Sequence, residues 1–286
     1  MPIDHAHVMS LTSKDETFTY TERDTMLYAL GIGLCGDPME KGELAFVYEN
    51  GLKTVPTMAT VIAWGAGRLG DSGINYAMVV HGEQRVTLHK PLPAAATILA
   101  DTHFIACLDK GAGKGAVLIS ETNIRDAKDN SALCTLTSSI FARADGGFGG
   151  PSEGGPDTHP IPTRAPDMEV DITTRPDQAL IYRLSGDRNP LHSDPDFAKM
   201  VGFPRPILHG LCTYGITCRA VMSTYCGNDA TQILSHDVRF SAPVFPGETV
   251  SVQMWRDGDV ISFEARVKTR DVVVIKNGKA VLRGTT

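Results

Sequence analysis

The sequence predicts an α+β fold in which one unit, helical segments followed by antiparallel strands, occurs twice. Two observations predict the unit: apolar residues at helical spacing precede strand-like alternation in each half, and the order of these segments repeats. A third is that residues 142–167, rich in Gly and Pro and almost free of aliphatic side chains, cannot bury a core of their own. We therefore predict a first copy over residues 1–143, a linker over 144–167 and a second copy over 168–286.

The composition excludes several classes of protein. With 286 residues, of which 42% are apolar and 21% charged, the chain has the make-up of a globular protein with one large domain or two ordinary ones. The net charge of −6 and the absence of a Lys/Arg cluster argue against a nucleic-acid partner. No run approaches the roughly 18 apolar residues of a membrane span. Six cysteines without a C-x-x-C pair are expected to be free thiols, and without a recognisable targeting signal the expected location is cytoplasmic.

Each copy is expected to open with a short helix. TERDTMLYALGIG begins at Thr21 and TRPDQALIYRLSGD begins at Thr174, and both open with the Thr-x-x-Asp pattern of a capping box. Both continue to Tyr-x-Leu, through Tyr28 and Tyr182, and then reach a glycine. The two tyrosines therefore give the alignment of the copies.

A second, more apolar helix is expected in each copy. In the first copy the segment is VPTMATVIAW, from Val55. In the second copy it is PRPILHGLCTYGITCRAVMSTY, from Pro204, and in both the apolar stretch comes after proline. The latter helix is predicted to begin near Pro206 and to stop at Gly227. Its apolar residues recur every three or four positions, as one buried helix face requires: Ile207, Leu211, Tyr214, Cys218, Val221, Met222 and Tyr225.

Antiparallel strands are expected after each apolar helix. In the second copy, residues 250–256, 261–267 and 272–276 have the alternation or the valine content of strands. Lys276, Asn277 and Gly278 are predicted to form a hairpin turn. HGEQRVTLH and GAVLISETNI give the corresponding strand signals in the first copy.

The second copy contains a polar trio that the first copy lacks. The stretch YRLSGDRNPLH places Asp187, Asn189 and His192 within six residues. When the copies are aligned on their tyrosines, Gly33 stands opposite Asp187 and Pro38 opposite His192, so the fold requires neither an acid nor an imidazole here. A structural role stays open, because Asp and Asn also build turns and a histidine can be a packed core residue. The comparison of the copies favours catalysis.

YRLSGDRNPLHSDPDFA, followed by GFPRPILHGLCTYG, resembles the signature of the type 2, (R)-specific, MaoC-like 2-enoyl-CoA hydratases. VYENG, HGEQ, DKGAGKGA and GGFGG in the first copy are similar to that family as well, so the resemblance covers most of the chain. It implies a double hot-dog fold, two tandem repeats that each wrap a curved antiparallel sheet around a long helix, as in the hydratase unit of peroxisomal multifunctional enzymes. It also implies that the second repeat is catalytic and that the first accommodates the acyl chain.

The reaction of that family, hydration of trans-2-enoyl-CoA to (3R)-3-hydroxyacyl-CoA, suits the trio. Water must lose a proton as it attacks C3 and C2 must gain one, and a carboxyl and an imidazole that share one water can handle both transfers. Which of Asp187 and His192 is formally the base stays open, and Asn189 would fix the water. The backbone N–H of Gly210, near a helix start, would stabilise the thioester oxyanion, as in the family. Close helix packing is the alternative role for this glycine.

The resemblance implies further contacts with the substrate. Lys110 would meet a phosphate or the pantetheine, with a solvated loop lysine as the alternative. Phe240 would wall the acyl channel, with a plain core position as the alternative. The expected substrate-binding residues are His81, Gly82, Lys110, Arg188, Pro190, Leu191 and Phe240.

No cofactor is expected, because CoA is part of the substrate. GAGRLG at 65–70 lacks the strand-then-helix context of a dinucleotide site, and GAGKGA at 111–116 is not a P-loop. The histidines and cysteines lack the spacing of zinc ligands, so no metal is expected. Two other functions stay open: dehydration of another acyl thioester, from a polyketide or sterol side-chain pathway, and acyl-CoA binding without turnover. The family also suggests a homodimer.

Overall fold

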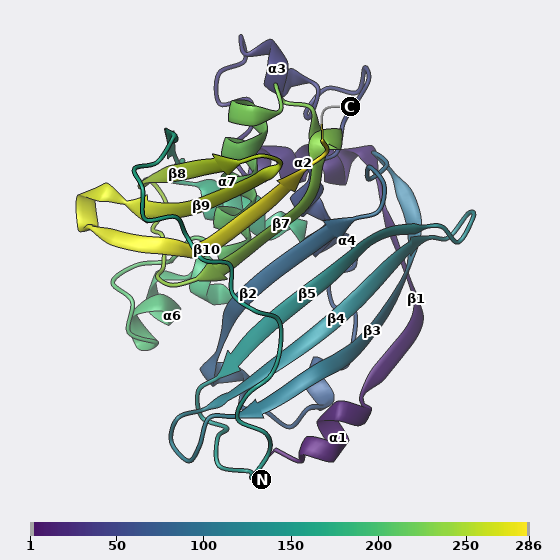
Figure 1. The fold of residues 1–286 in the computed structure, drawn as a ribbon, viewed down its shortest axis with the longest axis vertical. Coiled ribbons are helices and arrows are strands. Elements are labelled where there is room, and N and C mark those ends of the chain that lie inside the picture. The colour runs from purple at the N-terminus through teal and green to yellow at the C-terminus, as the bar shows by residue number, and fades with distance from the viewer. Residues whose placement is uncertain (1–2, 285–286) are drawn as a thin grey trace.

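One antiparallel sheet of ten strands forms the frame of the molecule, in a computed structural model that describes residues 3–284 (Figure 1). The strands are β1 (Thr12–Tyr20), β2 (Val79–Leu88), β3 (Ala96–Asp109), β4 (Ala116–Asp126), β5 (Ala132–Ala142), β6 (Met168–Thr173), β7 (Ile233–Phe240), β8 (Thr249–Asp257), β9 (Val260–Val267) and β10 (Val272–Leu282). The α-helices are α1 (His5–Ser10), α2 (Glu22–Gly31), α3 (Lys41–Leu44), α4 (Ala59–Ile62), α5 (Gln178–Tyr182), α6 (Pro195–Met200) and α7 (Gly210–Tyr225).

The strand order shows that the two halves are copies. Strands of the first half follow the order β1-β3-β4-β5-β2, and those of the second half, read from the opposite edge, follow the equivalent order β6-β8-β9-β10-β7. The copies meet where β2 pairs with β7, from Glu83 opposite Arg239 to Thr87 opposite Ser235. The predicted α+β fold with a duplicated unit is therefore confirmed. The predicted order of helices before strands is wrong, because β1 precedes α2 and β6 precedes α5.

The two aligned tyrosines face each other across the junction of the copies. Tyr28 on α2 and Tyr182 on α5 are both fully buried, and their ring centroids lie 5.9 Å apart. The helix α2, which contains Tyr28, begins as predicted, because Thr21 and Asp24 form a capping box. Its counterpart begins later than predicted, at Gln178. The Thr174 hydroxyl oxygen accepts from the N–H of Gly247 instead of a helix N–H, and it donates to the carbonyl oxygen of Glu248.

Within residues 3–284, a long central helix is found in the second copy and not in the first. α7 has 16 residues, of which eleven are buried, and Gly227 follows its end with a left-handed φ of 56°, as predicted. It begins at Gly210 rather than near Pro206, because His209 has an extended ψ of 136°, which a helix cannot continue through.

In the first copy, the predicted helix from Val55 is wrong in length. It is reduced to a 3-10 turn, Pro56–Met58, and the single turn of α4. The run Thr60, Val61 and Ile62 is β-branched, and Gly65 with left-handed φ follows it, so the helix is not continued.

The predicted hairpin turn at Lys276–Gly278 is also wrong, because β10 runs through it. Four residues of β10, Lys276 to Lys279, lie opposite three of β7, Arg239 to Asp237, which is a β-bulge with Asn277 at φ 54°. Gly278 lies against Phe263, where a Cβ would come within 2.3 Å of the ring. The alternation resumes to Leu282, so the bulge replaces the turn.

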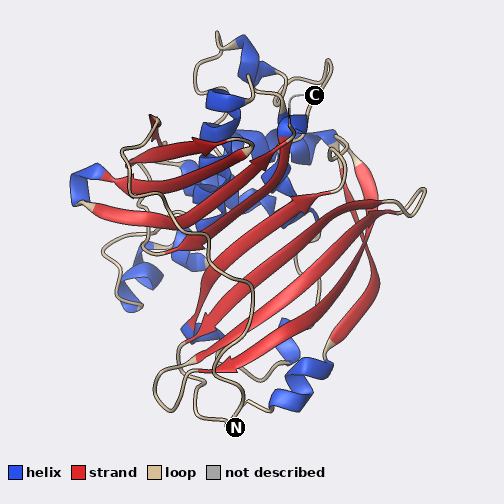
Figure 2. Ribbon diagram, viewed as in Figure 1, coloured by secondary structure: helices blue, strands red, loops and turns tan. Residues whose placement is uncertain are grey.

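Residues 144–167, the predicted linker, contain no helix or strand and cross one face of the sheet. Arg85 on β2 donates to the carbonyl oxygens of Pro156 and Asp157, and Trp255 on β8 donates to that of Arg164. Most helices lie behind the sheet and this segment lies in front of it (Figure 2). Whether each copy is a separate domain stays a prediction.

A single large cluster of buried apolar residues joins the copies and includes Tyr28, Tyr182, Tyr214 and Phe263. All six cysteines are free thiols, as predicted. None of the helices within residues 3–284 combines the length and the apolar character needed to cross a bilayer.

Candidate active site

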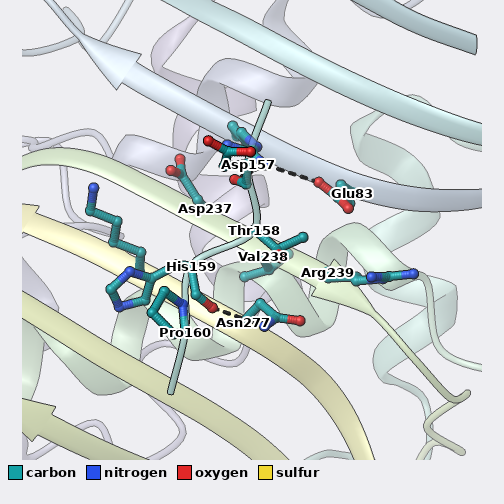
Figure 3. Close-up of a pocket in the computed structure, with 11 residues that line it drawn as sticks. Glu83, Asp157, Thr158, His159, Pro160, Asp237, Val238, Arg239 and Asn277 are labelled. Atoms are coloured by element: carbon teal, nitrogen blue, oxygen red, sulfur yellow. Dashed lines mark hydrogen bonds and ion pairs between the residues drawn. The ribbon is translucent and has the colours of Figure 1, made fainter. Parts of the chain in front are cut away.

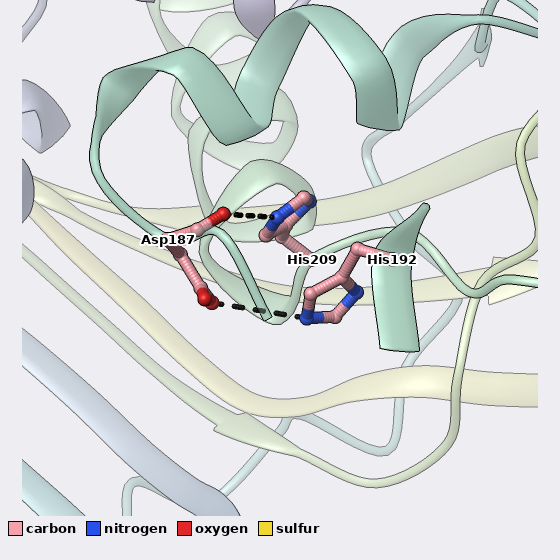
Figure 4. Close-up of side chains that lie close together, drawn as sticks. All are labelled: Asp187, His192 and His209. Atoms are coloured by element: carbon pink, nitrogen blue, oxygen red, sulfur yellow. Dashed lines mark hydrogen bonds and ion pairs between the residues drawn. The ribbon is translucent and has the colours of Figure 1, made fainter. Parts of the chain in front are cut away.

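Asp187, His192 and His209 meet at the N-terminal end of α7 (Figure 4). Asp187 follows the 3-10 turn Arg183–Ser185, His192 ends the 3-10 turn Pro190–His192, and His209 is the residue before α7. Oδ2 of Asp187 lies 3.7 Å from Nε2 of His192. The two imidazole rings stack with centroids 3.7 Å apart. The structure thus brings together the predicted acid and imidazole.

Asp187 can serve both roles considered from the sequence, since one of its oxygens supports the turn and the other is available for catalysis. Oδ1 of Asp187 accepts a hydrogen bond from the N–H of Asn189, and Oδ1 of Asn189 accepts one from the N–H of Leu191. Gly186 before it has φ 137° and lies against Trp64 of the first copy, so a side chain is excluded there. One oxygen of Asp187 builds the turn while the other faces His192.

His192 is held as a neutral imidazole with a basic nitrogen directed at Asp187. Its Nδ1 lies 2.9 Å from the carbonyl oxygen of Ile207, which can only accept, so Nδ1 carries the proton. Burial lowers the pKa of His192, and the hydrogen bond to Ile207 and the negative charge of Asp187 oppose this only in part. At neutral pH the lone pair on Nε2 is therefore free to accept a proton.

His209 is the member of the cluster that sequence reasoning missed. Its Nε2 donates to the backbone carbonyl oxygen of Asp187 at 3.1 Å, and its Nδ1 is buried without a hydrogen bond among the described residues. Burial, aided by the neighbouring His192, lowers the pKa of His209 to about 3. A histidine directly before a glycine has no sequence pattern that would indicate this contact, which joins residues 22 positions apart.

Gly210 is the first residue of α7 and has the geometry expected of an oxyanion donor. The first hydrogen bonds to the His209 carbonyl come from Cys212 and Thr213, so the N–H of Gly210 has no partner within the helix. The positive end of the helix dipole lies at the same place. A Cβ on Gly210 would come within 3.3 Å of the Phe240 ring, so the glycine also permits close packing.

A cavity of about 540 Å³ lies between the sheet and the linker, and four of the predicted substrate-binding residues line it. These are His81, Gly82, Lys110 and Phe240. Phe240 lies between this cavity and the cluster: its ring is 4.9 Å from that of His81 and packs on Gly210, whereas the residues of the cluster are not part of the cavity lining.

His81 itself is close to the cluster. Burial lowers its pKa to about 4, and the charge of Asp187 is among the influences that oppose this.

The other predicted substrate contacts lie outside the lining of this cavity. Arg188 and Pro190 are exposed and Leu191 is half-buried. Three cationic residues that were not predicted do line it: Arg85, Lys114 and Arg239. They were missed because they lie on separate strands and loops, and only the sheet brings them together.

A smaller cavity of about 220 Å³ continues beneath the linker (Figure 3). Asp237 lines it, and burial raises the pKa of this carboxyl to about 6. It shares Glu83, Arg85, Thr158 and Arg239 with the larger cavity. The two cavities therefore adjoin.

The chain matches two families, described as MaoC like domain over residues 157–278 and MFE-2 hydratase 2 N-terminal domain over residues 18–144. Enoyl-CoA hydratase ChsH3 of Mycobacterium tuberculosis is 40% identical, in a match that covers 97% of this chain and 98% of that protein. Peroxisomal enoyl-CoA hydratase 2 of Arabidopsis thaliana is 39% identical, covering 93% and 91%.

Solved structures give the same picture of the fold. A MaoC-like dehydratase from Phytophthora capsici has a TM-score of 0.88 at 35% identity, covering 99% of this chain and 98% of that one. A Mycobacterium tuberculosis protein described as a double hotdog fold has a TM-score of 0.53 at 14% identity, covering 95% and 97%. The duplicated helix-and-sheet arrangement is thus the double hot-dog fold.

Proposed function

Since this chain belongs to the MaoC-like dehydratase family, we propose that it catalyses the reversible hydration of trans-2-enoyl-CoA to (3R)-3-hydroxyacyl-CoA. Relatives named as enoyl-CoA hydratases support an enzyme of this class. The observation that carries the assignment to this site is the pair Asp187 and His192, 3.7 Å apart beside the first N–H of α7. The adjoining cavity of about 540 Å³ is of the size that small-molecule ligands occupy.

In the proposed mechanism, one water molecule supplies both groups that add across the double bond. It lies between Oδ2 of Asp187 and Nε2 of His192, and Nε2 takes its proton as the oxygen attacks C3. The electron pair of the double bond moves toward the thioester oxygen, where the N–H of Gly210 stabilises the developing negative charge. The Asp187–His192 pair then returns a proton to C2, so its protonation state is restored at the end of each turnover.

Asn189 is proposed to help to fix the water. Its side-chain oxygen is engaged by the N–H of Leu191, which leaves the amide N–H groups as donors. Since the same residue caps the 3-10 turn Pro190–His192, it also holds the backbone that carries His192.

The test follows the absorbance of the enoyl thioester with crotonyl-CoA and decenoyl-CoA. We expect the absorbance to fall, and the product to be oxidised by a dehydrogenase specific for (3R)-3-hydroxyacyl-CoA but not by one specific for the (3S) form. Measurable binding without loss of absorbance would instead support an acyl-CoA-binding protein. Turnover of neither substrate, with turnover of a polyketide-type or sterol side-chain thioester, would support a dehydratase of another pathway.

We propose that the reaction requires no metal or other cofactor. The ligand atoms of Asp187, His192 and His209 lie within 4.8 Å of one another, a spacing that could hold a cation. However, acid–base chemistry on the unsaturated thioester needs only the two side chains and the helix N–H described above. Dialysis against a chelator should therefore leave kcat unchanged.

We further propose that the chain forms a homodimer and works in the cytoplasm. A homodimer should have a mass of about twice 30.8 kDa when it is measured by light scattering. Fractionation of cells that produce the protein tests the cytoplasmic location, which matters because the Arabidopsis relative is named as peroxisomal.

A further inference from the structure

Two glycine-rich segments meet at one end of the larger cavity. One is the loop between β3 and β4, residues 110–115, and the other is the start of the linker, residues 146–152. Both Lys110 and Lys114 lie on the first segment and line the cavity. Glycines make up about half of each segment, and the ammonium of Lys110 donates to the carbonyl oxygen of Ser152 across the junction at 2.6 Å.

Asp109, at the end of β3, joins the two segments through its carboxylate. Oδ1 accepts hydrogen bonds from the N–H groups of Gly111 at 2.8 Å and Gly147 at 2.7 Å, and Oδ2 accepts one from Gly149 at 2.6 Å. The residue is 7% exposed, and no ion pair joins it to a cation among residues 3–284. The N–H groups, with that of Gly147 foremost, lower the pKa of Asp109, so it is a buried anion satisfied by backbone donors alone.

The backbone geometry at this junction depends on the glycines. A Cβ on Gly146 would come within 2.2 Å of the carbonyl oxygen of Gly111, and Gly147 has a left-handed φ of 95°. The segments therefore approach more closely than side chains would permit. A fully satisfied network of this kind fixes one arrangement.

Lys110 and Lys114 on this loop add positive charge to the lining of the cavity. The N–H of Lys110 donates to the carbonyl oxygen of Gly115 and that of Lys114 to Gly111, which closes the loop. Although the chain has a net charge of −6, the cavity is lined by the cations Arg85, Lys110, Lys114 and Arg239 and by one acid, Glu83. Such a lining favours a ligand that ends in several negative charges.

We propose that Asp109 is a positioning residue for the substrate, which holds the loop 110–115 against the linker and so presents Lys110 and Lys114 to the phosphate groups of the CoA nucleotide. This inference rests on the proposed function, since it takes the substrate to be a CoA thioester. Among residues 3–284 the carboxylate of Asp109 accepts hydrogen bonds from backbone N–H groups, so it would act on the phosphates through the lysines.

The decisive experiment compares two thioesters that carry the same acyl group, crotonyl-CoA and crotonyl-pantetheine, which lacks the nucleotide and its phosphates. Asp109→Asn places an amide against backbone N–H donors and should loosen the loop. We expect KM for crotonyl-CoA to rise about tenfold with kcat within about twofold of wild type, as for the loss of charge-assisted contacts. We expect kcat/KM for crotonyl-pantetheine to stay at the wild-type value.

Lys114→Ala, at an exposed position, should give the same selective loss and carries the test if Asp109→Asn does not fold. Asp129→Asn and Lys128→Ala are matched controls. Both change the turn at the other end of β4, where Asp129 accepts from the N–H of Ser131. Wild-type constants with both thioesters are expected for the two controls.

An equal loss with both thioesters would overturn the proposal, because it would show that Asp109 merely supports the fold. No loss with either would overturn it as well. If the wild type hydrates neither crotonyl-CoA nor decenoyl-CoA, the proposed function fails, and calorimetry with CoA and pantetheine then tests the positioning role alone. If it hydrates decenoyl-CoA alone, the decenoyl pair of thioesters replaces the crotonyl pair. In that case Asp109→Asn should weaken the binding of CoA about tenfold and leave that of pantetheine unchanged.

Discussion

At the scale of single residues, the two oxygens of Asp187 have separate partners. Because Asn keeps one carbonyl oxygen, Asp187→Asn can still accept from the N–H of Asn189 and preserve the turn, while it removes the carboxylate that faces His192. We expect kcat to fall at least ~100-fold, the usual scale for an acid–base group, with an unchanged Tm. The enoyl-thioester assay and a thermal melt check both. An unchanged kcat would remove Asp187 from the mechanism.

His192 is expected to be equally important. His192→Ala should lower kcat by at least ~100-fold, measured with crotonyl-CoA at pH 7. It also removes the hydrogen bond to Ile207, so His192→Gln, whose amide can reach a similar partner, is the companion variant. Wild-type rates in both variants would contradict the assignment.

The pH dependence of the wild type follows from the environment of His192. Burial is the largest influence on it and lowers its pKa below the ordinary value of 6.5, so the neutral, basic form persists to a lower pH. We expect kcat/KM to be on its plateau at pH 7 and to fall only when the pH drops below 6.5. A profile of kcat/KM against pH checks this. An acidic limb centred above 6.5 would mean that another group controls the rate.

The trio of site residues could be predicted because the sequence contains its own comparison, a copy without Asp187 and His192. His209 could not, because its part depends on the turn of residues 186–192 folding back onto the start of α7. That contact is tertiary, and a histidine before a glycine has no pattern that would reveal it.

At the scale of elements, the bulge in β10 makes a position at which size matters. A Cβ on Gly278 would overlap the ring and carbonyl of Phe263, at 2.3 and 2.5 Å, so Gly278→Ala should reduce the free energy of unfolding by roughly 1–3 kcal/mol. Gly70→Ala is the control, since nothing lies within 4 Å of its Cβ position. Denaturant titration measures both. Equal stabilities would show that the bulge adapts.

Asp237 on β7 makes the sheet sensitive to pH. It lies opposite Arg85 on β2 and Lys279 on β10, with Glu83 also nearby, yet burial outweighs the cations and raises its pKa from 3.8 to about 6. The folded state thus keeps a proton that the unfolded state has already lost, so stability decreases as the pH rises from about 4 to about 6. Asp237→Asn should stabilise the protein at pH 8, by up to about 3 kcal/mol, and little at pH 4.

Denaturant titrations at the two pH values test this. An equal effect at both would show that ionisation is not the cause.

The elements illustrate what local patterns can and cannot predict. The strand at 261–267 follows its period of two, and it was predicted almost to its ends. Asn277 and Gly278 have the residue types of a hairpin turn, but β7 and β9 continue beside them and favour a bulge. The helix from Val55 is shorter than predicted because β-branched residues and Gly65 end it, although Met58, Ala59 and Ile62 are buried in the shared core.

At the scale of the whole molecule, the copies share one sheet and one core, so we expect them to unfold together. The chain has one tryptophan in each copy, Trp64 and Trp255, which makes this measurable. The variant Trp64→Phe keeps Trp255, whose fluorescence reports on the second copy. The variant Trp255→Phe keeps Trp64, whose fluorescence reports on the first copy. In each variant, the unfolding midpoint measured by tryptophan fluorescence should coincide with the midpoint measured by circular dichroism. Two separated transitions in either variant would show that the copies are independent units.

The duplication itself was visible in the sequence, and so was the segment between the copies. The pairing of β2 with β7 was not, because alternation identifies a strand without identifying its neighbour. The cationic lining of the cavity was hidden for the same reason: Arg85 and Arg239 are distant in sequence and share a cavity only because their strands are adjacent.

The order of the strands has one more consequence for the way the chain is joined. β5 ends inside the first copy's sheet whereas β6 forms the outermost strand of the second, so any peptide that connects them must travel over the intervening strands. Two unlinked subunits in the same arrangement would leave that face bare. Because the copies are joined in one polypeptide, the linker covers the larger cavity without any additional helix or strand, and it covers one face because one segment joins the two ends.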